Sequence, residues 1–294
     1  MHEHKHIFSS AGIPCAASLF LPDTEQPPVV VMAQGFGAER QMGTTGFVRA
    51  FVEAGYAVFN FDYRSFGESL GAPRQHVHPK RHCEDWYNAL QYLRSLNSID
   101  NQRVALWGSS FSGGHVLVTA ARDQRVAGVI SQVPFCSARH MPATAGKQLR
   151  SLGHALLDRL LSLVGAQHRV ALVGEPGEGF AVMDWPGWKR DYLKIVGDSP
   201  TWTNSMPARG LLSVLGYNPI DHAAKINCPV LIVSGSRDQG VAREAIVETA
   251  AKIGNCQHQE LDFDHFDLYE GFDRHQQAIS LELDFLDKIF ASAP

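Results

Sequence analysis

Residues 107–114 read Trp107-Gly108-Ser109-Ser110-Phe111-Ser112-Gly113-Gly114, and they stand between an apolar strand-like run and an apolar stretch that can form a helix. A serine on a sharp turn from strand to helix, with small residues two positions before and after it, is the pattern of a nucleophile elbow. The turn strains the serine backbone, so bulk at Gly108 or Ser112 would collide with the flanking elements. The pattern predicts that Ser110 presents its hydroxyl above a sheet and that the Phe111 amide faces a developing oxyanion.

Two nucleotide-binding interpretations of the glycine-rich segments are excluded by the residues that follow the glycines. A phosphate-binding loop needs Lys and then Ser or Thr after its second glycine, but Gly114 and His115 stand there. A dinucleotide-binding loop fails at the segment Gly35-Phe36-Gly37, because Arg40 occupies the position of the third glycine. A strand–helix connection without chemistry stays open on the motif alone, so the rest of the chain must decide.

Two further side chains follow Ser110 in a meaningful order. A strand-like run, 229–234, leads to Asp238, and a later short segment leads to a turn that contains His265. The two residues lie 27 positions apart (265 − 238), which leaves room for one helix and one strand, so both can lie on loops at one sheet edge. In such a set, His265 takes the proton of Ser110 and returns it to the leaving group, while Asp238 orients the imidazole. Alternative orienting acids crowd His265, namely Asp262, Asp264 and Asp267.

With Ser110, Asp238 and His265 in this order, the chain resembles the α/β-hydrolase superfamily over nearly its whole length, apart from a central insertion. The resemblance implies an α/β-hydrolase fold, with a mostly parallel central sheet flanked by helices and an inserted helical cap. It also implies that these three residues are catalytic. Within the superfamily, the elbow and the His265-Phe266-Asp267 ending look most like the dienelactone-hydrolase-like or Xaa-Pro-dipeptidyl-peptidase-like branch.

The resemblance places the second oxyanion donor in the loop Gln34-Gly35-Phe36-Gly37. The expected oxyanion hole is formed by the backbone N–H groups of Phe36 and Phe111. Many members of the family carry His-Gly where this chain has Gln34-Gly35. Because the donor belongs to the backbone, this departure need not weaken the hole, and it leaves the role of the Gln34 side chain open.

The arrangement of apolar runs predicts the domains. Strand-like runs alternate with helical patterns, which favours a mostly parallel sheet covered on both faces, with the catalytic loops beyond the strand ends. We expect residues 1–135 and 217–294 to form the catalytic core and 136–216 to form a cap or lid. Within the expected cap, helical spacing is followed by Leu149, Leu152, Leu156, Leu160 and Leu163.

Aromatic and sulfur-containing side chains gather in the expected cap. Such a cap indicates that part of the substrate is apolar. The alternative is that these side chains form the cap's own core and its seal to the main domain. The residues that we expect in the substrate pocket are Gln34, Phe180, Met183, Trp185, Trp188 and Trp202.

Composition narrows the class of protein further. The 294 residues suit one catalytic domain with an insertion, and the net charge of −4 has no acidic or basic runs that favour nucleic acid or an anionic membrane. No apolar stretch is long enough to cross a bilayer, and the first residues lack the apolar segment of a secretory signal. The five cysteines are odd in number and show no paired spacing, which indicates reduced thiols in a cytoplasmic protein and leaves a single disulfide open.

Together these features predict a serine hydrolase that cleaves a carboxylic ester through an acyl-enzyme, with a small-molecule ester or acyl substrate. Neither a cofactor nor a metal site is expected. The same residues also suit thioester hydrolysis, acyl transfer or C–C bond cleavage, and these alternatives stay open. A non-catalytic ligand-binding protein on a retained fold is the alternative from another class, and a homodimer is left open.

Overall fold

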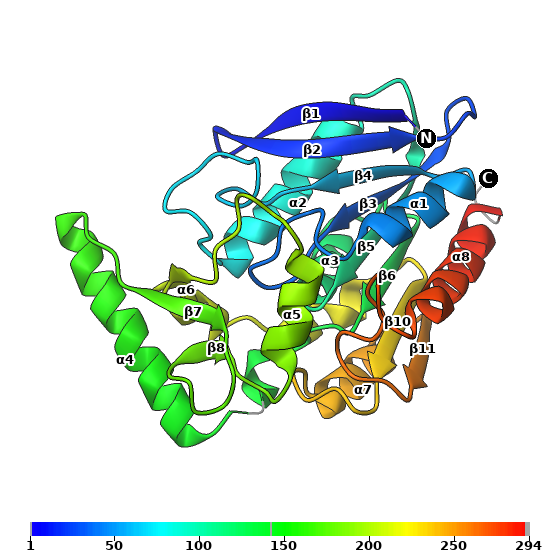
Figure 1. Cartoon of the computed structure of the whole chain (residues 1–294). Coiled ribbons are helices and arrows are strands. Elements are labelled where there is room, and N and C mark those ends of the chain that lie inside the picture. The colour runs from blue at the N-terminus through cyan, green and yellow to red at the C-terminus, as the bar shows by residue number, and fades with distance from the viewer. Residues whose placement is uncertain (1, 142, 292–294) are drawn as a thin grey trace.

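An eight-stranded sheet lies at the centre of the computed structural model, which describes residues 2–141 and 143–291 (Figure 1). Its strands are β1 (His2–Ser10), β2 (Ile13–Leu21), β3 (Pro28–Ala33), β4 (Ala57–Phe61), β5 (Asp100–Ser109), β6 (Gly128–Gln132), β10 (Val230–Gly235) and β11 (Cys256–Leu261). They are ordered β1-β2-β4-β3-β5-β6-β10-β11. β2 pairs antiparallel with β1 and with β4, and all the other neighbours in this sheet are parallel.

Helices cover both faces of this sheet. One face carries α2 (Pro79–Leu93), α3 (Phe111–Arg122) and α7 (Arg243–Lys252), and the other carries α1 (Thr45–Glu53) and α8 (His275–Ala291) (Figure 1). Successive side chains of a strand point to opposite faces, so Leu106 of β5 enters one hydrophobic core and Trp107 enters the other. The predicted fold, a mostly parallel sheet flanked by helices, is confirmed.

The register of the parallel strands brings three loops to one edge. Ser109 at the end of β5 pairs with Gln132 of β6, and Gly235 at the end of β10 pairs with Leu261 of β11. β6 and β10 are buried along their whole length, as expected of central parallel strands, whereas β11 at the edge of the sheet is only partly buried and carries polar side chains. The loops that follow β5, β10 and β11 therefore emerge on the same side of the sheet.

The segment between β6 and β10 is mixed in structure rather than helical throughout. It contains the α-helices α4 (Ala145–Leu161), α5 (Trp188–Val196) and α6 (Gly210–Val214), the strands β7 (Arg169–Val173), β8 (Ala181–Met183) and β9 (Met206–Pro207), and the 3₁₀ turns η1 (Ala138–His140), η2 (Ser162–Val164), η3 (Pro219–Asp221) and η4 (Ala223–Lys225). The three strands form a small sheet ordered β8-β7-β9. The β-branched and apolar run of β7 favours a strand, and proline- and glycine-containing turns separate the elements around it.

We call residues 136–216 the insertion. In Figure 1, α5 lies beside the main sheet, while α4 extends away from the rest of the molecule. Across the described residues, none of the helices combines the length and the apolar character that a membrane crossing demands.

Candidate active site

The nucleophile elbow adopts the strained geometry that its sequence predicts. Ser110 has φ 59° and ψ −119°, between the end of β5 and the first residue of α3. A β-carbon at Gly108 would lie only 2.4 Å from the carbonyl oxygen of Ser112, so this position requires glycine. The turn is held at both sides, because the Ser110 N–H donates to the Gln132 carbonyl at 2.8 Å and the Phe135 N–H donates to the Ser110 carbonyl at 2.9 Å.

The structure brings Ser110, Asp238 and His265 together. Nε2 of His265 lies 3.0 Å from the Ser110 Oγ, and Nδ1 lies 2.6 Å from Oδ2 of Asp238. The His265 and Asp238 side chains are both buried. The other oxygen of Asp238 accepts a hydrogen bond from the Gly240 N–H at 2.8 Å, which fixes the carboxylate in its loop. A hydroxyl, an imidazole and a carboxylate that are hydrogen-bonded in this order can generate a nucleophile and move its proton.

The other acidic residues near His265 contact different partners. Asp264 accepts a hydrogen bond from the backbone N–H of His265 at 2.7 Å, not from its ring. Asp267 accepts one from the Asp264 N–H at 2.8 Å. Asp262 is exposed and pairs with Arg237 at 2.9 Å. Asp238 is therefore the acid that orients the ring.

The loop after β3 packs directly against the elbow. A β-carbon at Gly35 would lie 2.9 Å from Cβ of Ser110 and 3.4 Å from the Phe111 nitrogen. The rings of Phe36 and Phe111 meet edge to face, with centroids 5.2 Å apart. The two residues expected to donate backbone N–H groups to an oxyanion thus lie on adjoining loops beside Ser110.

Gln34 braces this loop. Its buried side chain accepts a hydrogen bond from the Gly35 N–H at 3.1 Å through Oε1 and donates one to the Met42 carbonyl through Nε2. Both ends of the amide are therefore engaged by the loop itself. Gln34 lies in the wall of the active-site cavity, but its polar atoms hold the backbone in place.

A narrow cavity lies over the Ser110 hydroxyl. Its volume is about 10 Å³, close to the least that one water molecule needs. Its walls are mostly apolar and come from Gln34, Gly35, Phe36, Ala38, Ser110, Met183, Trp188, Tyr192, Ile195, His265, Phe266 and Tyr269. Over the described parts of the chain, no three His, Cys, Asp or Glu side chains are grouped so that they could hold a metal ion.

Trp188 closes the cavity from the side of the insertion. Its indole stacks on the His265 ring, with centroids 4.6 Å apart and an interplanar angle of 27°. Its six-membered ring lies so close to Gly240 that a β-carbon there would sit 1.8 Å from the nearest carbon. The insertion therefore touches both the histidine and the loop that carries Asp238.

Three residues expected in the pocket lie elsewhere. Phe180 and Trp185 line an outer hollow of the insertion, where Arg150 and Lys147 lie over their rings. Trp202 packs against Tyr192 and donates its indole N–H to the Gly37 carbonyl at 3.0 Å. These three rings stabilise the insertion and its seal to the core, as the alternative interpretation held.

Other lining residues escaped the sequence analysis. Tyr192 and Ile195 continue the face of α5 that begins with Trp188, and this spacing of four and three residues was the signal available. Phe266 and Tyr269 follow His265 in the turn after β11, and only the folded turn shows that they face the cavity.

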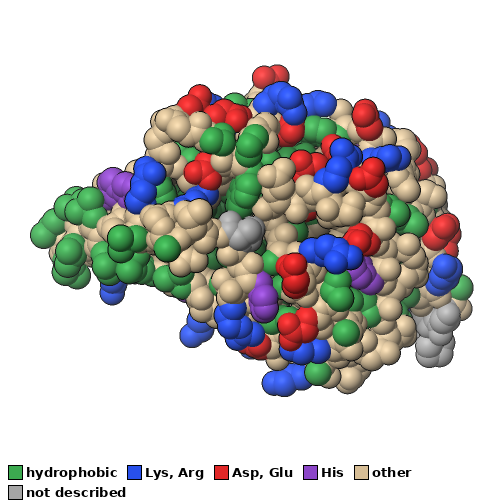
Figure 2. Space-filling view, turned by 90° about the horizontal axis from the view of Figure 1, so that it is seen from below, with side chains coloured by type: hydrophobic (Ala, Val, Ile, Leu, Met, Phe, Trp, Pro, Cys, Tyr) green, Lys and Arg blue, Asp and Glu red, His purple; other side chains and the backbone are tan. Residues whose placement is uncertain are grey.

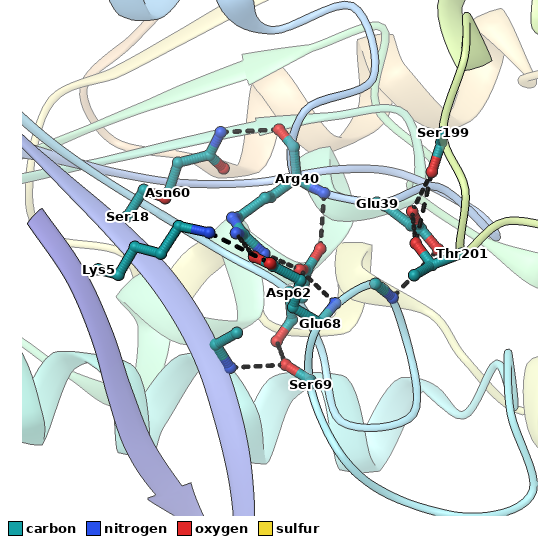
Figure 3. Close-up of polar contacts among 12 residues, drawn as sticks. Lys5, Ser18, Glu39, Arg40, Asn60, Asp62, Glu68, Ser69, Ser199 and Thr201 are labelled. Carbon is teal, nitrogen blue, oxygen red and sulfur yellow. Dashed lines mark hydrogen bonds and ion pairs between the residues drawn. The ribbon is translucent and has the colours of Figure 1, made fainter. Parts of the chain in front are cut away.

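A polar network fastens the insertion to the core beside this cavity (Figure 3). One carboxylate oxygen of Glu39 accepts hydrogen bonds from the hydroxyls of Ser199 and Thr201, both at 2.7 Å, and the other accepts one from the Gly67 N–H at 3.1 Å. Ser199 and Thr201 belong to the insertion, while Glu39 lies in the loop after β3, just beyond Phe36. Glu39 therefore connects the insertion to the loop after β3.

Arg40, the residue after Glu39, also holds the loop after β3 in place. The buried guanidinium of Arg40 pairs with Asp62 and Glu68, and its backbone N–H donates to Asp62 at 2.8 Å (Figure 3). Burial raises the pKa of the Asp62 carboxyl to about 6, and Arg40 opposes that rise. The ion pairs of Arg40 with Asp62 and Glu68 therefore fix the backbone of the loop after β3.

Comparison with known proteins agrees with this geometry. The profile of the family described as "Serine aminopeptidase, S33" matches residues 24–267. The chain belongs to this family of α/β hydrolases. Its activity is therefore that of a hydrolase, and the family assignment covers most of the core and the whole insertion.

Individual relatives span different shares of the chain. The quorum-quenching protein AidA of Acinetobacter baumannii (strain MDR-ZJ06) is 36% identical over 285 residues, which cover 96% of this chain and 93% of AidA. The thiohydrolase aneE of Aspergillus aculeatus (strain ATCC 16872 / CBS 172.66 / WB 5094) is 36% identical over 127 residues, 43% of this chain and 40% of aneE. The crystal structure of the α/β hydrolase GrgF from Penicillium sp. sh18 shares the fold, with a TM-score of 0.87, 22% identity, and coverage of 99% of this chain and 100% of GrgF.

Proposed function

We propose that this chain is a serine hydrolase that cleaves a carboxylic ester with an apolar acyl or alcohol portion through an acyl-enzyme. The observation that carries the proposal is the hydrogen-bonded series from Ser110 through His265 to Asp238, which lies beneath a narrow, mostly apolar cavity. A single exposed serine would not support it, because an unassisted hydroxyl is a weak nucleophile.

Each residue has a defined role in the proposed reaction. Ser110 Oγ attacks the ester carbonyl while His265 takes its proton through Nε2 and passes it to the leaving alcohol. Asp238 keeps the proton of the imidazole on Nδ1 and stabilises the imidazolium. The backbone N–H groups of Phe36 and Phe111 bind the oxyanion. Water, activated by the same histidine, then releases the acid and restores Ser110.

The insertion acts as a cap in this proposal, over a core formed by residues 1–135 and 217–294. Met183, Trp188 and Ile195 supply apolar walls from the insertion, and Phe266 supplies one from the core. A hydrocarbon portion of the substrate would replace these contacts and stay out of water. Membership of the dienelactone-hydrolase-like branch stays a prediction.

Thioester hydrolysis is the second candidate. It is favoured by the similarity to the thiohydrolase aneE, and the same nucleophile and oxyanion hole would serve. The similarity to a quorum-quenching protein over 96% of the chain makes small signal molecules that contain an ester bond a further class to test.

A fluorophosphonate probe tests the nucleophile, since it labels only an activated serine. We expect one adduct on the peptide that contains Ser110, and none in the Ser110→Ala variant. Ser109→Ala is the matched control and should keep the label, because the Ser109 hydroxyl contacts Tyr269 at 2.6 Å behind the elbow. An unlabelled protein would favour a ligand-binding role without catalysis.

A substrate panel tests the bond and the pocket. It compares short polar esters, longer apolar esters, cyclic esters, thioesters and amides at equal concentration. We expect kcat/KM to rise with the length of the apolar chain among the esters. Equal turnover of short polar and long apolar esters would contradict the apolar pocket, and faster thioester cleavage would select the second candidate.

A further inference from the structure

Helix α4 carries a stripe of leucines on its outer face. We call Leu149, Leu152, Leu156 and Leu160 of α4, together with Leu163 of the adjoining turn η2, the leucine ridge, and their exposed fractions run from 39% to 75%. Leu157 and Val164 extend the exposed patch beside it. Figure 2 shows hydrophobic side chains gathered on the projecting arm that α4 forms. Soluble monomers rarely expose a contiguous apolar patch of this kind, which usually marks an interaction surface.

The opposite face of α4 makes the contacts with the rest of the insertion, and it is small and polar. Asp158 is fully buried and accepts hydrogen bonds from the backbone N–H groups of His168 at 2.7 Å and Arg209 at 2.8 Å. Ala155 is buried beside it, and Nδ1 of His154 lies 2.9 Å from Nε2 of His168. A surface helix of a monomer normally packs its apolar face against the protein and exposes its polar face, and α4 does the opposite.

The spacing of the ridge is symmetric about its middle residue. Leu149 and Leu163 lie seven residues on either side of Leu156, and Leu152 and Leu160 lie four residues on either side. We propose that the ridge packs against the ridge of a second copy of this chain, antiparallel and about a two-fold axis at Leu156. Leu149 then faces Leu163 of the partner subunit, and Leu152 faces Leu160 of the partner subunit, so each contact occurs twice.

The charges on α4 fit the same pairing. In antiparallel register, Arg159 falls opposite position 153, which is a glycine whose missing side chain leaves open space. Arg150 falls opposite Ser162, and Lys147 falls opposite Gly165. No cation meets a cation across the axis, whereas a parallel pairing would place each cation beside its own copy. A lipid surface could cover leucines too, but it would not require their mirror spacing.

Sedimentation equilibrium of the full chain tests the proposal. We expect the wild-type protein to have twice the mass of one chain at micromolar concentration. Leu156→Lys places two ammonium groups face to face on the axis and should raise the dimer Kd on the order of 100-fold, because like charges across an interface cost several kcal/mol. Val247→Lys is the matched control, an exposed apolar residue on α7 of the core, and it should leave the dimer intact.

A charge-pair rescue tests the register. Leu152→Glu alone and Leu160→Lys alone should each weaken the dimer, and the double variant should restore it, because the antiparallel contact then holds two salt bridges. Circular dichroism shows whether each variant is folded. A monomeric wild-type chain, a Leu156→Lys variant that stays dimeric, or a double variant no tighter than the single ones would overturn the proposal. A monomer that floats with phosphatidylcholine–phosphatidylserine vesicles would assign the ridge to a lipid surface instead.

Discussion

The indole of Trp188 stacks on the imidazole of His265 with ring centroids 4.6 Å apart, although the two residues lie on different parts of the molecule. Trp188 begins α5 in the insertion, and His265 follows β11 in the core. The contact links closure of the insertion to the position of the proposed general base. Substrate must displace this ring, or share the space beside it, to reach Ser110.

The stacking contact predicts the behaviour of two variants. Trp188→Ala removes the surface that holds His265, so we expect kcat/KM for an apolar ester to fall about 10- to 100-fold, as for a small misplacement of a catalytic group. Trp188→Phe keeps an aromatic surface and should retain most of the activity. Steady-state kinetics with one long-chain ester measures both. Equal activity of Trp188→Ala and wild type would mean that the ring does not position His265.

The hydrogen bond from His265 to Asp238 predicts that replacing one carboxylate oxygen of Asp238 by an amide nitrogen lowers kcat strongly. Asp238→Asn should lower kcat about 10⁴-fold while the protein stays folded, because the amide favours the wrong imidazole tautomer. Asp262→Asn is the matched control, since that carboxylate is exposed and pairs with Arg237. The two variants are compared by kcat and by thermal unfolding. Near-normal turnover in Asp238→Asn would move the role to another acid.

Glu39 should stabilise the closed insertion. Glu39→Ala leaves the Ser199 and Thr201 hydroxyls and the Gly67 N–H without their partner, so we expect the free energy of unfolding to fall by about 1–3 kcal/mol. Faster proteolytic cleavage around residues 199–201 should accompany it. Asp198→Ala changes an exposed neighbour and should leave both measurements unchanged. A Glu39→Ala protein with wild-type protease resistance would show that the apolar contacts alone hold the insertion.

Glu282 predicts a pH dependence of stability. Its carboxylate side chain is fully buried on α8, accepts a hydrogen bond from the Trp107 indole at 2.9 Å, and has its pKa raised to about 8 by burial. The folded chain therefore keeps a proton that the unfolded chain loses near the ordinary pKa of glutamate. The contribution is fully present below that pKa and is lost as pH rises toward about 8.

Urea unfolding at several pH values measures this effect. Between pH 5 and pH 8.5, wild type should lose about 1 kcal/mol or more of stability relative to Glu282→Gln, which carries no titrating group at that site. Glu244→Gln, at an exposed position on α7, should keep the wild-type pH profile. Parallel profiles for wild type and Glu282→Gln would show that this carboxyl is ionised in the folded chain.

Local sequence was enough to predict the sheet and the three polar side chains of the site. Parallel strands buried on both faces tend to be continuous apolar runs, so Pro28–Ala33 and Val230–Gly235 could be recognised without the structure. The strained turn at Ser110 restricts its neighbours to small residues, and this restriction is visible in the sequence. Asp238 and His265 were then assigned because their order after the elbow is the one that the resemblance to the α/β-hydrolase superfamily implies.

The pocket could not be predicted in the same way, because an aromatic residue in an insertion has several places to pack. Trp188 and Trp202 belong to one aromatic-rich stretch, yet only Trp188 reaches the cavity, since α5 turns that side chain toward His265. Helical spacing showed that the leucines of α4 share a face but not that this face points outward. That outcome depends on Asp158, which holds the other side of the helix.

In one of the hydrophobic clusters shared by the insertion and the core, Trp188, Tyr192 and Ile195 pack with Phe266 and Tyr269. Because the space over Ser110 holds about one water molecule, a larger ligand has to move these side chains apart to occupy it. The cost of parting falls when a hydrocarbon tail fills the vacated space, because the apolar surfaces then remain dry. The enzyme would thus select long over short molecules when they enter the cavity, before any covalent bond changes.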